Sequence, residues 1–137
     1  MIFQVSLFTV FTLILVSYIG TSLILFVAGT YIMQMYASSK GWDNSFKIPL
    51  RINVIMLLIN LAVGIPLSFL YGDSVVLDFV RFGINVVLGV IFIGKYYKKD
   101  RGVSVQFILV VQLILFIIAV IFSNIFGMIS LYVVGAL

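Results

Sequence analysis

Four side-chain amides stand inside otherwise apolar stretches and are the first candidates for chemistry. Asn60, Asn85 and Gln112 fall near the middle of three different apolar segments, so they should lie at similar depth in a membrane. Asn53 precedes Asn60 by seven residues, which places both on one face of a helix. Amides buried in hydrocarbon seek hydrogen-bond partners on neighbouring helices. Two interpretations stay open: the amides hold the helices together, or they line a polar path for a solute.

Asp78 and Arg81 form the second candidate group. Their spacing of three residues puts both on one face of a helix and lets them form an ion pair. They lie at the outer end of their apolar segment, where the sequence favours an interfacial pair that contributes less than about 1 kcal/mol. The alternative is a pair that faces a partner or gates a cavity. Because no span centre holds an ionisable residue, the sequence argues against proton coupling or an ion relay.

Catalysis is the function that the residue inventory most strongly excludes. Hydrolysis inside a membrane needs a nucleophile with a base, paired carboxylates or a metal. The chain has no His and no Cys, and its four acidic residues are all Asp, divided between the two ends of the predicted spans. We therefore predict no enzyme activity, no catalytic residue, no cofactor and no metal site. The lack of Cys also rules out disulfides.

The basic residues gather in two connectors between apolar segments. Positive charge close to span ends is retained on the cytoplasmic side, so both connectors are expected there and both termini outside. The second connector also offers contacts to anionic lipid headgroups, whereas nucleic acid is not an expected partner. The residues are Lys40, Lys47 and Arg51 in the first connector, and Lys95, Lys98, Lys99 and Arg101 in the second.

The whole chain has the composition of a membrane protein. Of its 137 residues, 64% are hydrophobic and only 9% are charged, whereas about a quarter are charged in soluble domains. We predict an all-α integral membrane four-helix bundle made of two antiparallel hairpins, as a single domain over residues 1–137. The expected spans are about 2–36, 48–69, 75–96 and 103–124, with a helical extension over 125–137 and a short turn at 71–74. The first span is expected as one long helix, with a break near Gly20 as the alternative.

A set of short motifs resembles the Yip1 family of polytopic membrane proteins. The pattern is Gly41…Ser45-Phe46-Lys47…Leu50-Arg51, then an apolar span ending in Pro66, another span, and Arg101-Gly102-Val103-Ser104 opening a further span. The likeness covers about residues 30–122. It implies a non-enzymatic membrane protein that works through partners, in eukaryotes in vesicle trafficking. The family's typical first span and double glycine have no counterpart here.

Two functions follow as expectations. The first is a small non-catalytic integral membrane subunit or adaptor that packs against other membrane proteins, or against itself, through its overlong first and last helices. The second is a homo-oligomeric transporter or channel for a small solute, with a polar path lined by Asn60, Asn85 and Gln112.

Overall fold

Four long helices make up nearly all of the protein. The computed structural model describes residues 7–71 and 75–136. The helices are α1 (Leu7–Ser39), α2 (Lys47–Tyr71), α3 (Val75–Tyr96) and α4 (Arg101–Ala136), and the described residues form no strand. Each helix is long and apolar enough to cross a membrane, so the chain has the architecture of a multi-pass membrane protein. The predicted all-α, four-helix fold class is confirmed.

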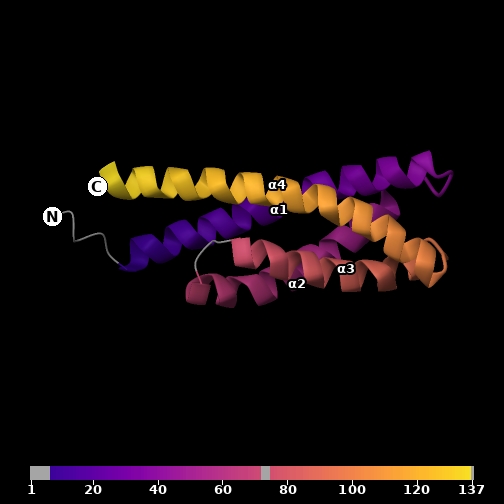
Figure 1. Cartoon of the computed structure of the whole chain (residues 1–137), viewed down its shortest axis with the longest axis horizontal. Coiled ribbons are helices and arrows are strands. Elements are labelled where there is room, and N and C mark those ends of the chain that lie inside the picture. The colour runs from indigo at the N-terminus through magenta and orange to yellow at the C-terminus, as the bar shows by residue number, and fades with distance from the viewer. Residues whose placement is uncertain (1–6, 72–74, 137) are drawn as a thin grey trace.

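The helices pack as two antiparallel hairpins, α1 with α2 and α3 with α4, and the hairpins contact each other through α1–α4 and α2–α3. Both basic connectors lie at one end of the bundle, on the right in Figure 1. The start of α1 and the end of α4 lie at the opposite end (Figure 1). The predicted placement of both connectors on one side of the bundle therefore agrees with the structure.

Two local signals in the sequence set the helix ends at the connectors. Gly41 adopts a left-handed backbone (φ 75°) after α1, a conformation that glycine adopts at little cost. The Trp42 N–H then bonds to the Ala37 carbonyl (3.0 Å) and the Gly41 N–H to the Ser38 carbonyl (3.0 Å), which is the Schellman pattern. At the start of α4, Asp100 Oδ1 accepts a hydrogen bond from the Val103 N–H (2.8 Å) as an N-cap.

The Schellman turn directs Trp42 back onto the bundle, where it joins the two connectors. Its ring stacks on Phe107 of α4 (centroids 4.7 Å apart) and lies against Tyr97 of the second connector (5.2 Å). Lys99 places its ammonium 5.0 Å from the same ring, within cation–π distance. We call Trp42, Tyr97, Lys99 and Phe107 the connector cluster. It links the α1–α2 hairpin to the α3–α4 hairpin at the basic end.

Two helices are much longer than the others. α1 runs without a break through Gly20, which agrees with the predicted single long helix, and α4 continues as one helix through Ser123 and Asn124 to Ala136. At 1.5 Å per residue they are about 50 and 54 Å long, against about 33 Å for α3. Residues 2–6 of the first predicted span, residue 137 of the extension and positions 72–74 of the predicted turn lie outside the described residues.

Candidate functional site

A buried ion pair lies inside the bundle, in the first two turns of α3. Arg81 Nη1 and Asp78 Oδ1 are 3.1 Å apart, and their side chains are 6% and 1% exposed. The spacing correctly predicts the pair, but the expected exposure of the two side chains is wrong, because both are buried. α1 and α4 extend beyond the start of α3 (Figure 1). Both side chains are buried and bond to residues of these two helices, so two ionisable groups lie within the helix bundle.

Three further side chains surround the ion pair. Ser123 of α4 donates its hydroxyl to Asp78 Oδ1 (3.2 Å), and Arg81 Nη2 donates to Ser22 Oγ of α1 (3.3 Å). The Tyr18 ring lies against the guanidinium, with 4.8 Å from Arg81 Cζ to the ring centroid. The pair on α3 is therefore bound to both α1 and α4.

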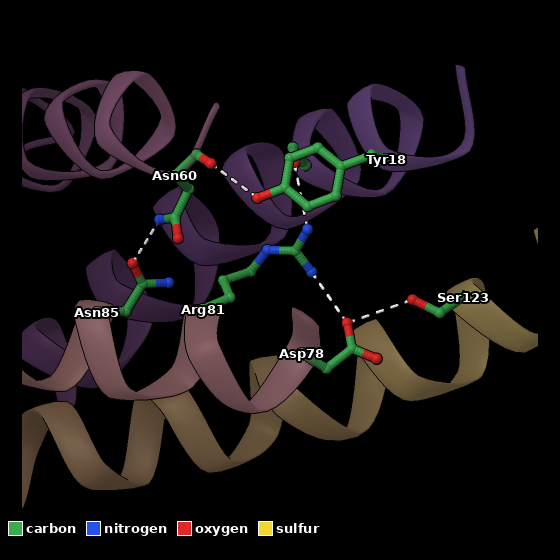
Figure 2. A network of polar contacts seen from close by, with 7 residues as sticks. Tyr18, Asn60, Asp78, Arg81, Asn85 and Ser123 are labelled. Carbon is green, nitrogen blue, oxygen red and sulfur yellow. Dashed lines mark hydrogen bonds and ion pairs between the residues drawn. The ribbon is translucent and has the colours of Figure 1, made fainter. Parts of the chain in front are cut away.

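Asn60 and Asn85 join α2 to α3 at the next level of the bundle. Asn60 Nδ2 donates to Asn85 Oδ1 at 2.6 Å and also to the Met56 carbonyl at 2.7 Å. The Tyr18 hydroxyl donates to the Asn60 backbone carbonyl at 2.7 Å. Figure 2 shows the Arg81 guanidinium between the Asn60–Asn85 pair on one side and Asp78 on the other. One connected polar core thus contains both the amides and the ion pair.

Asn53 and Gln112 occupy the same interior without joining this network directly. Asn53 Nδ2 donates to the Pro49 carbonyl one turn earlier (2.8 Å). Asn53 Oδ1 packs against Gly29 of α1, in the space that a Cβ atom at that position would occupy. Gln112 is 2% exposed, and its Nε2 has no hydrogen-bond partner. All four predicted amides therefore line one interior space: Asn53, Asn60, Asn85 and Gln112.

That space is a cavity of about 30 Å³ between the four helices. Four buried polar atoms of the residues that line it lack a hydrogen-bond partner: Asn60 Oδ1, Asp78 Oδ2, Arg81 Nε and Gln112 Nε2. An unsatisfied buried polar atom costs about 1–3 kcal/mol. Four of them around one cavity favour a bound polar molecule. The lining residues are Ser22, Leu25, Phe26, Asn53, Met56, Leu57, Asn60, Asp78, Arg81, Phe82, Asn85, Gln112, Leu115, Phe116 and Ala119.

The predicted headgroup contacts lie at the other end of the bundle from the ion pair. Lys98 and Arg101 are exposed, Lys95 lies 5.7 Å from the centroid of the Tyr96 ring, and Lys99 belongs to the connector cluster. None of the four reaches the cavity. They form a separate basic surface around the connectors.

The chemistry open to the polar core is hydrogen bonding and charge pairing. Across residues 7–71 and 75–136, no group of three His, Cys, Asp or Glu side chains comes close enough to hold a metal ion. Sequence reasoning missed Tyr18, Ser22 and Ser123 as part of the site. For Tyr18 and Ser22 the sequence does carry a signal, a group of hydroxyl side chains around Gly20, where the sequence also allows a helix break.

Comparison with known proteins identifies no relative. No family model matches the chain, and no curated protein and no solved structure is significantly similar to it. The resemblance to the Yip1 family therefore stays a prediction, and the function has to be argued from the polar core and the helices that enclose it.

Proposed function

We propose that this protein is a transporter or channel for a small solute, with the polar core as its binding site. One observation carries the proposal: four residues whose side chains hold polar atoms without partners line one cavity inside a membrane-spanning bundle. Ionisable and polar residues within membrane spans are expensive and usually mark substrate or ion pathways. A core that served only to join the helices would pair these atoms with one another.

The polar groups also extend along the bundle, which favours a path over a single point of adhesion. Asn53 and Asn60 are separated by about 10 Å along α2, and Asn85 and Asp78 by a similar distance along α3. The bond between Asn60 and Asn85 joins the polar residues of α2 to those of α3 at one depth in the bundle, so together they form one continuous row. The path then covers about 20 Å of a hydrocarbon core that is about 30 Å thick.

The orientation that we propose puts the basic end in the cytoplasm and both termini outside. The seven cations of the two connectors support it through the positive-inside rule. The exposed Lys98 and Arg101 then face the anionic headgroups of the cytoplasmic leaflet. The ion pair lies toward the outer end of the path in this orientation.

Purified protein in liposomes tests the transport proposal. The wild type should increase the flux of at least one member of a panel of water, glycerol, urea, K⁺ and Cl⁻ over protein-free vesicles. Asn60→Leu removes the central amide and should abolish that flux. Asn124→Leu makes the same change at an exposed site on α4 and should leave it unchanged. Equal flux through the wild type and the Asn60→Leu variant would exclude the proposed path.

A second function, a non-catalytic subunit or adaptor, is favoured by the length of α1 and α4. With the basic connectors at one membrane surface, about 20 Å of α1 and about 24 Å of α4 extend past a hydrocarbon core that is about 30 Å thick. These ends carry no charge and expose large apolar side chains, including Phe8 (79%), Leu131 (75%) and Tyr132 (81%). Apolar surface of this kind outside lipid marks an interaction site.

Isolation from the native membrane separates the two functions. An adaptor should copurify with other polypeptides in a native gel, as mass spectrometry would detect, and should tolerate Asn60→Leu. A transporter should run alone as a symmetric oligomer and lose its flux in that variant. The resemblance to the Yip1 family, whose members work through partners, supports the adaptor.

A further inference from the structure

The cavity wall carries no net charge. Among the described residues that line it, Asp78 and Arg81 are the only ionisable ones, and they neutralise each other at 3.1 Å. Transfer of an ion from water into a low-dielectric interior costs several kcal/mol unless an unused opposite charge compensates it. A cation in this cavity meets the Arg81 guanidinium, and an anion meets the Asp78 carboxylate. The electrostatics of the site therefore oppose an ionic ligand.

The unpartnered atoms of the residues that line the cavity are divided evenly between donors and acceptors. Asn60 Oδ1 and Asp78 Oδ2 accept hydrogen bonds, whereas Arg81 Nε and Gln112 Nε2 donate them. All four side chains are at least nine-tenths buried. A ligand that satisfies them must itself both donate and accept. An apolar guest or an acceptor-only anion leaves at least two of these atoms without a partner.

The size of the cavity limits the ligand further. A volume of about 30 Å³ exceeds the roughly 10–15 Å³ that a single water molecule requires and is far below the roughly 300–1,000 Å³ of a pocket for a drug-sized ligand. The close contacts nearby restrict expansion of the site, since the Tyr18 ring covers Arg81 on one side and the Asn60–Asn85 bond closes another.

We propose that the polar core takes neutral, water-sized molecules that both donate and accept hydrogen bonds, with water itself as the first member of the class, and that it excludes ions. This inference rests on the proposed solute path and names its substrate class. The paired Asp78 and Arg81 serve the exclusion: each supplies one hydrogen-bonding atom while cancelling the charge of the other.

Binding is tested first, independently of transport. In lipid nanodiscs, NMR transfer of polarisation from water protons should reach the side-chain NH₂ groups of Asn60 and Gln112. Gln34, which bonds to the Asn44 carbonyl near the connector, serves as the reference for contact with outside water. Gln112→Leu should reduce the transfer to Asn60 severalfold, whereas the matched change at the exposed Gln106 of α4 should not. If no polarisation reached Asn60 and Gln112 from water in the wild type, the proposal would be wrong.

Flux measurements then separate the substrate class from the proposed function. Osmotic water permeability of proteoliposomes should exceed that of protein-free vesicles severalfold, with no K⁺ or Cl⁻ current. Water at the amides without any flux would uphold the ligand class and refute transport. An ion current through the wild type would uphold transport and refute the ligand class.

A variant that removes the positive charge of Arg81 tests whether the ion pair excludes ions. Arg81→Gln keeps a hydrogen-bonding side chain but leaves the Asp78 carboxylate uncompensated, so K⁺ current should appear where the wild type shows none. The circular dichroism spectrum reports whether this variant stays folded; if it does not, Gln112→Leu and the wild-type ion current still decide the question. A folded Arg81→Gln protein that carries no K⁺ current while water flux persists would contradict the role assigned to the pair.

Discussion

The Tyr18 phenol of α1 occupies the space that a side chain at Gly64 of α2 would fill. This close approach lets the Tyr18 hydroxyl reach the Asn60 carbonyl one turn earlier on α2. The same ring lies against the Arg81 guanidinium of α3, so one side chain touches two other helices. Gly64 is thus a packing requirement of the polar core.

Gly64→Ala should therefore destabilise the bundle. The added methyl group meets the Tyr18 ring, and overpacking of this kind costs about 1–3 kcal/mol. Gly83→Ala is the matched control, because nothing lies within 4 Å of a methyl group at Gly83, and alanine in a helix gains about 0.5–1 kcal/mol over glycine. Unfolding by SDS in mixed micelles, followed by circular dichroism, measures both. Equal stability of the two variants would show that Tyr18 does not pack as described.

Removing one partner of the ion pair should lower the free energy of unfolding more than the removal of both partners would suggest. Asp78→Leu or Arg81→Leu leaves a buried charge without its partner, which costs about 3–5 kcal/mol. The double variant buries no charge and should be less destabilised than the sum of the two single variants. The same SDS titration gives the coupling free energy. Strictly additive effects would mean that the two side chains do not interact.

Alkaline pH should weaken the protein through Tyr97. Burial, and secondarily the charge of Asp43, raises the pKa of Tyr97 from its ordinary value of 10.0 to about 12. The folded state thus keeps the phenol neutral where the unfolded state ionises it. This contribution to stability is complete below pH 10 and is lost as the pH rises from about 10 to about 12.

Tyr97→Phe tests that pH dependence. Phenylalanine cannot ionise, so the fall in stability between pH 10 and 12 should become smaller. The Tyr97 hydroxyl has no hydrogen-bond partner, so at neutral pH the variant should gain about 1 kcal/mol. Tyr132→Phe, at a position 81% exposed, should change neither value. An unchanged alkaline transition in Tyr97→Phe would place the responsible group elsewhere.

Both connectors should react with a membrane-impermeant thiol reagent from the same side. The chain has no cysteine of its own, so Ser45→Cys, Arg101→Cys and Tyr132→Cys are each single-cysteine proteins. The first two sites lie at the basic end, and the third near the end of α4 at the other (Figure 1). In inside-out vesicles the first two should be labelled and the third protected, with the reverse in right-side-out cells. Labelling of 45 and 101 from opposite sides would contradict the bundle.

The helices could be predicted from the sequence because hydrophobic runs of bilayer length have few other solutions. The meeting of the amides could also be anticipated, since similar depth and the need for partners bring Asn60 and Asn85 together. The two groups of basic residues between the apolar runs indicated the connectors. These inferences depend on composition and local spacing alone.

The burial of Asp78 and Arg81 could not be predicted in the same way. Nearly every position on these helices is apolar, so the pattern does not reveal which face of α1 or α4 is turned inward. The ion pair is buried because α1 and α4 pass the start of α3 and present Ser22 and Ser123 to it. That arrangement follows from the relative lengths and register of the four helices, which only the folded structure supplies.

The connector cluster joins the two hairpins at one end only. Trp42 contacts Phe107 and Tyr97 there, whereas the contacts between α1 and α4 at the far end include the weak Ser17–Ser130 approach (3.5 Å) and Gly20 beside Phe126. The stacked rings hold the two hairpins together at the basic end, and the Arg81–Ser22 bond joins them again near the start of α3. Beyond that bond the contacts between α1 and α4 include the Ser17–Ser130 approach and Gly20 beside Phe126, so we expect the proposed path to open at the end of the bundle where α1 begins and α4 ends.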